Sequence, residues 1–557
     1  MELRSFEKPY VFIKLGDWGT ENNICPLLFQ LHPKLFWKNL ANSFFPLVNM
    51  LPATDEKETP GTSASSVSSD ISNSSHKQQD GSWLLASAAT ATTIPVNDRW
   101  YYYLSDSAAE RLPHYQYRGA DLSLLYKYVL SPFATWCVDN LTPTWVAPNA
   151  ITLFGLAWMV LAYFVIWCWC PGLYEANTDI ATTPEKQYSV PAVIFLLNGF
   201  AMLIYQTLDN MDGKQARKTG TSSPLGLLFD HGCDALNLIL GSANWIAAMA
   251  LIPGNVSDLL GEGYDGSNVQ SKSLLSHCCG GDANLACILI FSPMIAFYIS
   301  TWEQYYTGTL ILPPFNGPSE GLVLGAFLSI ASFFMGPMFW QGTSLADGAI
   351  ALGSSFDDDI TSFLAPMHGR VRNMDLIVLS ALVSLVQEVV YKTSSVVRKY
   401  GVQTLRTTTP HLVLVASTLA MVHFDTTIFL RNPRTMLHLI SGLFTEQTTQ
   451  LMMDHMVEEE YEVGKRWCVF PLVFLAVWIM TGLSSMQAVD GFLLVYTIGL
   501  WIYLAFKISI QICEICDVLG IYCFDIVTVH PKKLMGVRDK IVGTTVAAVA
   551  GTAKKTD

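Results

Sequence analysis

The chain has 557 residues, of which 51% are hydrophobic and only 14% are charged, whereas a soluble protein of this length carries about a quarter charged residues. The formal net charge of −13 excludes a nucleic-acid-binding protein, because such proteins present a basic face. The twelve cysteines do not show the paired spacing of a structural zinc site, since Cys513-x-x-Cys516 lacks a second pair of ligands.

The first 148 residues divide into three predicted parts. Residues 1–53 are an N-terminal extension without a signal peptide, because the opening stretch "MELRSFEKPY" is charged. Residues 54–97 are a Ser-rich linker that we expect to be disordered, because it has too few apolar residues to form a core. Residues 98–148 are predicted to be a juxtamembrane segment, with an interfacial helix over residues 114–136 where Tyr, Lys and Leu mix without reaching spanning length.

From residue 149 onward, apolar runs of about 20 residues recur, and this length lets a helix cross a bilayer. We therefore predict an all-α polytopic membrane protein with about ten transmembrane helices. The runs lie near residues 149–170, 189–208, 226–252, 283–300, 321–340, 374–394, 410–430, 436–454, 468–485 and 489–513.

The loops between these runs differ in charge, and cytosolic loops carry an excess of Lys and Arg. Acid-leaning loops lie at residues 171–188 and 253–282. Basic segments contain Lys214, Arg217, Lys218, Arg398, Lys399, Arg406, Lys532, Lys533, Arg538 and Lys540. With ten spans, the acid-leaning loops and the basic segments are predicted to lie on opposite sides of the membrane, with both termini in the cytosol. Arg431 and Arg434, on the predicted outer side, do not follow the rule.

Four aspartates interrupt the apolar pattern at the predicted cytosolic ends of two consecutive spans. Asp209 and Asp212 are three residues apart and Asp230 and Asp234 are four apart, so each pair shares one helix face. If the two helices are antiparallel neighbours, the four carboxylates converge, and such a group repels itself unless cations are bound. Oxygen-only ligands favour Mg²⁺ or Mn²⁺, and two such ions suit in-line displacement at a phosphate.

The residues between the aspartates fit a phosphate ligand. Gly213, Ala216 and Gly226 are small enough to let a ligand approach the backbone. Arg217 and Lys214 supply positive charge for phosphate oxygens.

His231 follows Asp230 and precedes Asp234 by three residues, so Asp234 is expected to orient the imidazole ring. A neutral imidazole in this place would accept a hydroxyl proton. Taken singly, these features have simpler explanations: a hydrogen-bonded structural histidine, small residues that serve helix packing, and buried acids that belong to an ion-coupled transporter. A catalytically inactive scaffold is a further alternative, although such a protein would be expected to lose one of the aspartates.

Together the residues form Asp209-x-x-Asp212-Gly213-x-x-Ala216-Arg217 followed, after eight residues, by Gly226-x-x-x-Asp230-x-x-x-Asp234. This pattern resembles the complete signature of the class I CDP-alcohol phosphotransferase family. The stretches "DGKQAR", "SSPLG", "DHGCD", "WVAPNAIT" and "TWEQYYTGTLILPPFNGPSEG" are similar to the eukaryotic choline/ethanolamine phosphotransferase branch. The resemblance covers roughly residues 100–530.

The resemblance implies transfer of phosphocholine or phosphoethanolamine from a CDP-alcohol to diacylglycerol, with release of CMP. It implies that Asn149 and the segment around Gly213 and Arg217 bind the CDP group, and that the four aspartates hold two Mg²⁺ or Mn²⁺ ions. The general base is either His231 or Asp234, and we favour His231 because a metal-bound aspartate is a poor base. An enzyme of the family that uses another alcohol is an alternative.

The same resemblance predicts a catalytic core over residues 149–340, further transmembrane helices over 341–530, a cytosolic tail over 531–557, and a homodimer. Choline favours aromatic faces and ethanolamine favours hydrogen-bond acceptors. Candidates for headgroup recognition, in the predicted loop after the fourth span, are Trp302, Glu303, Tyr305, Tyr306 and Glu320.

The predicted address is the endoplasmic reticulum membrane, with the Golgi as an alternative. Lys554 and Lys555 match the dilysine retrieval pattern of cytosolic tails, and the acid-leaning loop holds the glycosylation triplet Asn255-Val256-Ser257. Lysines that merely keep the tail soluble are the simpler alternative.

Overall fold

The computed structural model describes residues 3–5, 11–13, 102–176, 190–251, 273–312, 318–354, 367–483 and 485–524. The chain divides into two units, Met1–Pro95 and Val96–Asp557, which are treated separately. In the first unit, β1 (Leu3–Ser5) pairs antiparallel with β2 (Val11–Ile13). The predictions for residues 54–97 and 531–557, including Lys554 and Lys555, and for Asn255 concern residues outside the described part.

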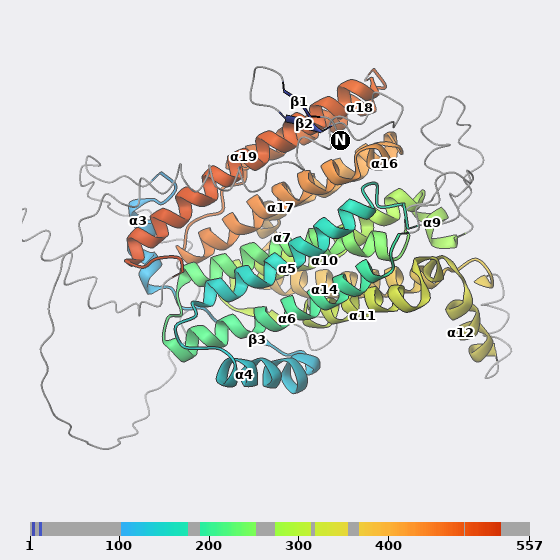
Figure 1. Cartoon of the computed structure of the whole chain (residues 1–557). Helices are drawn as coiled ribbons and strands as arrows, with labels where there is room; N and C mark the ends of the chain where they lie inside the picture. Colours follow the sequence, from blue (N-terminus) through green and yellow to red (C-terminus); the bar gives the residue numbers. More distant parts are fainter. Residues whose placement is uncertain are drawn as a thin grey trace, which may run out of the picture. The chain divides into compact units, whose positions relative to one another are not determined.

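The described part of the second unit is mostly helical, as predicted, with two short strands (Figure 1). Its long and short helices, in chain order, are α3 (Asp106–Arg111), η3 (Leu112–His114), η4 (Tyr126–Leu130), α4 (Ser131–Asn140), α5 (Pro148–Trp169), α6 (Val193–Thr219), α7 (Pro224–Ala248), α9 (Leu274–Cys279), α10 (Asp282–Thr307), α11 (Pro318–Met335), η6 (Pro337–Gln341), α12 (Ser344–Ser354), α14 (Asn373–Tyr400), η8 (Val402–Thr408), α15 (Thr409–Phe424), α16 (Ile428–Arg431), α17 (Pro433–Met456), η9 (Val463–Lys465), η10 (Trp467–Val469), α18 (Phe470–Met480) and α19 (Met486–Leu519). The strands are β3 (Gly119–Asp121) and β4 (Leu310–Leu312), which pair in parallel.

A helix lies at each of the ten predicted apolar runs. Four of these helices, α5, α10, α14 and α19, are long and apolar enough to cross a membrane, while α11 and α18 are shorter apolar helices. The protein therefore has the character of a helical membrane protein, whereas the number of ten spans stays a prediction.

The helices pack so that α5 contacts both α6 and α7, which carry the four aspartates. α11 covers another side of α6, and α10 and α17 pack against α7. The large apolar core is built from these helices and includes Phe195, Ile239, Met294 and Phe444, each at most 2% exposed. Consequently the aspartate-bearing helices are held on several sides by neighbours.

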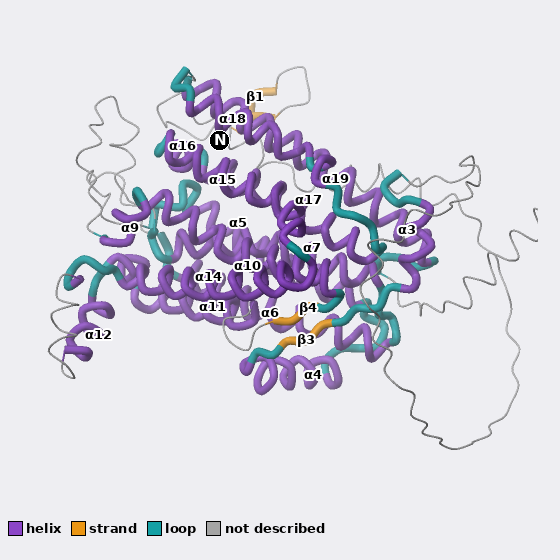
Figure 2. The backbone as a smooth tube through the Cα atoms, turned by 180° about the vertical axis from the view of Figure 1, so that it is seen from behind, coloured by secondary structure: helices purple, strands orange, loops and turns teal. Residues whose placement is uncertain are grey.

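The segment between residues 102 and 123 differs from the predicted interfacial helix over residues 114–136. It contains η3 and the strand β3, and continuous helix begins only at residue 124 and ends at residue 140. The strand forms because β4 offers its backbone to residues 119–121, a long-range pairing that local sequence patterns do not reveal. Figure 2 shows both strands next to α4. Tyr128, Phe133 and Trp136 are exposed apolar side chains of the helical part, as a membrane interface would favour.

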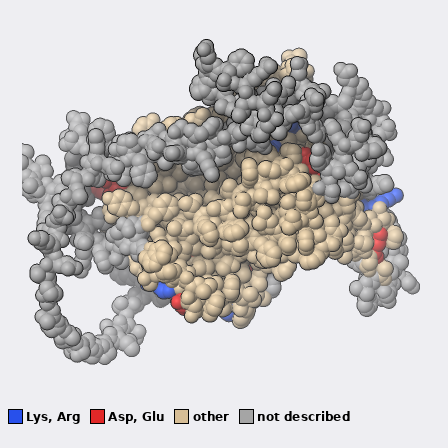
Figure 3. Space-filling view, viewed as in Figure 1, with Lys and Arg blue, Asp and Glu red and all other residues tan. Residues whose placement is uncertain are grey.

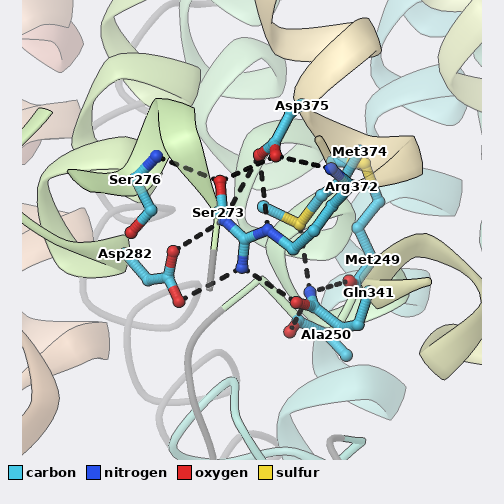
Figure 4. A network of polar contacts seen from close by, with 9 residues as sticks. All are labelled: Met249, Ala250, Ser273, Ser276, Asp282, Gln341, Arg372, Met374 and Asp375. Atoms are coloured by element: carbon cyan, nitrogen blue, oxygen red, sulfur yellow. Dashed lines mark hydrogen bonds and ion pairs between the residues drawn. The ribbon is translucent and has the colours of Figure 1, made fainter. Parts of the chain in front are cut away.

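At the opposite end of α10 from β4, a buried ionic network joins four helices (Figure 4). The Arg372 guanidinium, at the start of α14, binds Asp282 of α10 with Nη2 2.8 Å from Oδ1 and lies 3.3 Å from Asp375. It also donates to the Gln341 side chain of η6, which in turn donates to the carbonyls of Met249 and Ala250 after α7. Removing one partner of such a network leaves an uncompensated buried charge, so it fixes how these helix ends meet.

The described surface in Figure 3 is mostly uncharged, and the Lys, Arg, Asp and Glu atoms visible on this face lie toward its edges and ends. Exposed apolar side chains such as Phe154, Val383, Val386 and Phe506 lie on the helices themselves. An uncharged middle between polar ends is what a lipid-facing surface requires.

Candidate active site

A cavity of about 430 Å³ opens where α6 ends and α7 begins, a size usual for sites that bind small molecules. Three helix ends contribute to its wall, because the first turn of α5, the last turns of α6 and the first two turns of α7 all line it. Two segments distant in sequence complete it, residues 115–117 before β3 and residues 521–523 after α19.

The junction of α6 and α7 follows from local capping. α6 ends at Gly220, whose φ of 70° is a left-handed conformation that glycine adopts without strain. α7 begins with Ser223, whose hydroxyl accepts the backbone N–H of Gly226 at 3.1 Å, and with Pro224 in the first turn. The turn between the two helices is therefore short, and the electropositive N-terminus of α7 lies beside the last turn of α6.

Three of the four predicted metal ligands lie together. One carboxylate oxygen each from Asp209, Asp230 and Asp234 lies within 4.8 Å of the other two, and the three side chains are half-buried. One oxygen each of Asp209 and Asp230 is buried without a hydrogen-bond partner. An all-carboxylate donor set with unsatisfied oxygens fits a divalent ion such as Mg²⁺ or Mn²⁺.

Asp212 is not one of the three carboxylates that lie within 4.8 Å of one another, although it lines the same cavity. Its Oδ2 accepts the Thr152 hydroxyl of α5, and its Oδ1 accepts the backbone N–H of Gly213. The residue is buried and lines the cavity together with Asp230. The structure thus gives Asp212 neutral partners of its own, whereas the sequence pattern treated all four aspartates alike.

His231 lines the cavity, as expected, but Asp234 does not orient it. Nδ1 of His231 is buried without a hydrogen-bond partner, and the ring packs against Phe297 of α10 with centroids 5.9 Å apart. Asp234 accepts a hydrogen bond of 2.7 Å from the Tyr205 hydroxyl of α6. The expected His231–Asp234 pair fails because residues three apart on α7 are drawn to different neighbouring helices.

Most residues predicted to contact the CDP group line the cavity. Asn149, Gly213, Ala216, Arg217 and Gly226 are among its wall residues. A Cβ on Gly213 would lie 3.4 Å from Arg217 Nη1, an ordinary van der Waals contact, so Gly213 and the guanidinium are close neighbours in the wall.

Lys214 does not belong to the described wall of the cavity. Its ammonium donates to the Ser131 hydroxyl of α4 at 2.8 Å and lies over the Tyr126 ring. The phosphate-binding role predicted for Lys214 therefore lacks support from its position.

The five predicted headgroup residues are placed elsewhere. Trp302, Glu303, Tyr305, Tyr306 and Glu320 are not among the described lining residues, and the first four lie in the last turns of α10 rather than in a loop.

Each of these five side chains has a partner within the fold. Trp302 donates to Thr407, Tyr306 contacts Thr407, Tyr305 donates to the Glu459 carbonyl, Glu303 lies 3.8 Å from Lys392, and Glu320 accepts from Ser123. These contacts give all five residues a structural role, because aromatic and acidic residues near the end of a span also serve helix packing, and their role in headgroup recognition stays a prediction.

The sequence did not indicate that Tyr115, Gln116 and Tyr117 would line the cavity. The chain just before them is anchored at two points. The Glu514 carboxylate of α19 accepts the backbone N–H of Leu104 at 3.1 Å, and Arg111 donates to the Val457 carbonyl at 2.8 Å. The alternation of aromatic and polar residues in "HYQYR" was the only available signal.

Residues 521–523 were likewise missed. The Asn149 side-chain amide donates to the Cys523 carbonyl at 2.7 Å, which holds the end of the described chain at the first turn of α5. Nothing local in "LGIYCF" indicates this contact, because Asn149 lies 374 residues earlier.

Burial shapes the chemistry of the two tyrosines. It raises the pKa of the Tyr115 hydroxyl to about 12, and a nearby Gln304 amide opposes the rise. Burial also raises the pKa of Tyr117, and the neighbouring Asp230 carboxylate raises it further. Both phenols therefore stay neutral at physiological pH, and Tyr117 lies close to the carboxylate cluster.

Comparison with known proteins agrees with this geometry. The CDP-alcohol phosphatidyltransferase family matches residues 145–256, which contain all four aspartates. The chain is 27% identical to an uncharacterized CDP-alcohol phosphatidyltransferase class-I family protein 3 of Dictyostelium discoideum, over 77% of this chain and 99% of that protein.

Two named enzymes are also similar. Choline/ethanolaminephosphotransferase 1 of Arabidopsis thaliana is 29% identical over 76% of this chain and 98% of its own length. Choline/ethanolaminephosphotransferase 1 of Saccharomyces cerevisiae is 35% identical over 40% of this chain and 46% of its own length. Residues 145–256, which carry all four aspartates, are therefore a CDP-alcohol phosphatidyltransferase domain.

Proposed function

We propose that the protein transfers phosphocholine, phosphoethanolamine or both from the CDP-alcohol to diacylglycerol, forming phosphatidylcholine or phosphatidylethanolamine and CMP. The observation that carries this proposal is the group of carboxylates from Asp209, Asp230 and Asp234 beside a cavity lined by Arg217 and Asn149. The names of the similar plant and yeast enzymes support the choice of alcohols.

The proposed roles follow from charge and position. Asp209, Asp230 and Asp234 would hold Mg²⁺ or Mn²⁺, with Asp212 beside them, and two ions bound there would supply neutralisation of the pyrophosphate charge. Arg217 would bind phosphate oxygens, aided by the N-terminus of α7. Asn149 would contact the nucleotide.

The reaction proposed is an in-line displacement. The hydroxyl oxygen of diacylglycerol forms a bond to the β-phosphorus of the CDP-alcohol, and the bond from that phosphorus to the bridging oxygen breaks, so that CMP leaves. An imidazole nitrogen of His231 takes the hydroxyl proton; Asp234 is the alternative acceptor. His231 suits the role because its Nδ1 has no partner, whereas Asp234 already accepts the Tyr205 hydroxyl.

The proposal extends to the surroundings of the site. We propose ten spans, residence in the endoplasmic reticulum membrane, an active site on the cytosolic side, and a homodimer. Ten helices at the predicted apolar runs and the alternating charge of the loops support the topology.

Purified protein in lipid nanodiscs with diacylglycerol and Mg²⁺ or Mn²⁺ provides the test. Each donor, CDP-choline, CDP-ethanolamine and CDP-glycerol, is supplied separately, and phospholipid and CMP are both quantified. We expect equal amounts of CMP and phospholipid from at least one of the first two donors. If the folded protein formed phospholipid from CDP-glycerol alone, the alcohol assigned to the donor would be wrong. A folded protein that is inactive with all three donors would refute the proposal.

A further inference from the structure

A group of buried polar atoms without hydrogen-bond partners surrounds Tyr115, a residue of the cavity wall. Its hydroxyl is buried without a hydrogen-bond partner, and its ring makes an edge contact with His455 of α17, with centroids 5.6 Å apart. Both side-chain amide atoms of Gln304 and Nε2 of His455 also lack partners. Gln304 is only 1% exposed. Buried polar groups are nearly always satisfied, so this group indicates a place for a polar ligand.

This group of polar atoms lies toward the reactive end of the cavity. Tyr117, two residues from Tyr115 in the same segment, is a neighbour of the Asp230 carboxylate. The carboxylate end is where the transferred phosphate would bind, and the alcohol is attached to that phosphate. The part of a CDP-alcohol that extends beyond the β-phosphate would therefore meet Tyr115 and Tyr117.

The chemistry of this wall suits a cation. Tyrosine faces attract ammonium groups, and an amide oxygen accepts an N–H from a primary ammonium. Among the described lining residues, the one Lys or Arg is Arg217, which is carried by α6 rather than by the segment of the two tyrosines. No permanent positive charge on residues 115–117 opposes a cationic ligand.

We propose that Tyr115, Tyr117 and Gln304 form the subsite for the positively charged alcohol headgroup. This inference rests on the proposed function. The ring faces serve the trimethylammonium group of choline, and Gln304 Oε1 accepts an N–H from the ammonium of ethanolamine. Gln304 lies among residues 302–306 of α10, whose other members pack within the fold.

The two donors should respond differently to two substitutions. Tyr115→Leu removes an aromatic face, so kcat/KM for CDP-choline falls about tenfold more than that for CDP-ethanolamine. Gln304→Leu removes the acceptor, so the larger loss, again about tenfold, falls on CDP-ethanolamine. Tyr115→Phe keeps the ring and should keep CDP-choline use near the wild-type value.

A substitution at Gly119 tests the position of the Tyr117 ring while keeping the tyrosine itself. A Cβ on Gly119 would lie 2.1 Å from the Tyr117 hydroxyl oxygen, so Gly119→Ala forces the ring to move. We expect this variant to lose discrimination between the two donors. Gly464→Ala is the matched control, because nothing lies within 4 Å of a Cβ there.

Binding of CMP, which lacks the headgroup, separates recognition from damage to the fold. Calorimetry with Mn²⁺ should give the wild-type Kd for CMP in all the headgroup variants. Tyr128→Leu, at a tyrosine that is 67% exposed, should leave both donors and CMP unaffected.

The outcomes are distinct. Wild-type donor preference in Tyr115→Leu and Gln304→Leu would overturn the subsite, and so would an equal loss for both donors together with weaker CMP binding. Inactivity of the wild-type protein with every donor would instead refute the proposed function.

Discussion

Asp212 and Asp230 share the wall of one cavity, yet their carboxylates are held differently. Thr152 and the backbone of Gly213 satisfy both oxygens of Asp212. Asp230 keeps a buried oxygen without a partner, within reach of Asp209 and Asp234. Hydrogen-bond donors thus position Asp212, whereas Asp230 has an oxygen available to a cation.

We predict that Asp230→Asn abolishes turnover while leaving the protein folded, because the amide cannot replace a charged ligand. The rate of phospholipid formation should fall by at least about a hundredfold, the scale seen when a site's essential charge is lost. EDTA should act in the same way on the wild-type protein, reversibly on addition of Mg²⁺.

Asp139→Asn is the matched control, since Asp139 is exposed on α4. Asp212→Asn should also inactivate. Activity that survives in excess EDTA would contradict the metal site.

His231→Ala should lower kcat far more than it weakens binding of the CDP-alcohol, because proton transfer arises only in the reaction. Removing a general base typically costs about 10²–10⁴-fold in rate. Steady-state kinetics with donor binding measured separately by calorimetry would show this split, with His423→Ala, at an exposed histidine, as control. A near-native kcat would indicate that Asp234, rather than His231, is the general base.

At the scale of helices, α6 is positioned through close contacts at glycine. A Cβ on Gly199 of α6 would lie 2.6 Å from Ile330 Cγ1 and 2.9 Å from the Ala326 carbonyl oxygen of α11. A Cβ on Gly325 of α11 would likewise lie 2.0 Å from the ring of Trp245 on α7. Glycine at these positions lets α11 approach both helices that carry the aspartates.

Gly199→Ala should therefore destabilise the protein by about 1–3 kcal/mol, the usual cost of overpacking. Thermal unfolding in detergent, followed by size-exclusion chromatography, would measure the loss. Gly491→Ala on α19 is the matched control, because its Cβ would meet nothing within 4 Å and alanine favours a helix by about 1 kcal/mol over glycine. Equal stability of the two variants would contradict this account of the α6–α11 contact.

At the scale of the whole molecule, the two arginines that break the charge rule have local explanations. Arg431 pairs with Asp425 at 2.9 Å and with Asp490 at 3.0 Å. Arg434 donates to the Cys170 carbonyl at 2.6 Å and lies over the Tyr163 ring. Because both arginines bind partners within the fold, they are weak evidence against the membrane orientation predicted from the basic loops.

That orientation predicts which cysteines a membrane-impermeant maleimide can reach. Cys278 is exposed just before α10, whose 26 residues extend for about 39 Å toward the end near the cavity. In sealed microsomes Cys278 should be modified only after permeabilisation, as detected by mass spectrometry. A cysteine introduced at exposed Asp139, in α4 near the end of α6, should react in intact microsomes, and the reverse pattern would invert the topology.

The sequence alone determined the features of this protein that depend on neighbouring residues in the chain. Apolar runs located the long helices, and the spacing of Asp209 to Asp212 and of Asp230 to Asp234 placed each pair on one helix face, because 3.6 residues make one turn. Gly220 and Ser223 mark the end of α6 and the start of α7, since helix caps are read from a few adjacent residues.

Only the tertiary structure decided how these helices meet other parts of the chain. Tyr115–Tyr117 and residues 521–523 reach the cavity from opposite ends of the described second unit. Thr152 of α5 donates a hydrogen bond to Asp212, and Tyr205 takes the place expected for His231 beside Asp234. These contacts join residues tens to hundreds of positions apart, and their energy comes from packing and hydrogen bonds that no local pattern encodes. The residues around Trp302 illustrate the limit, because only their neighbours in space show that they support the fold and that both amide atoms of the buried Gln304 between them lack hydrogen-bond partners.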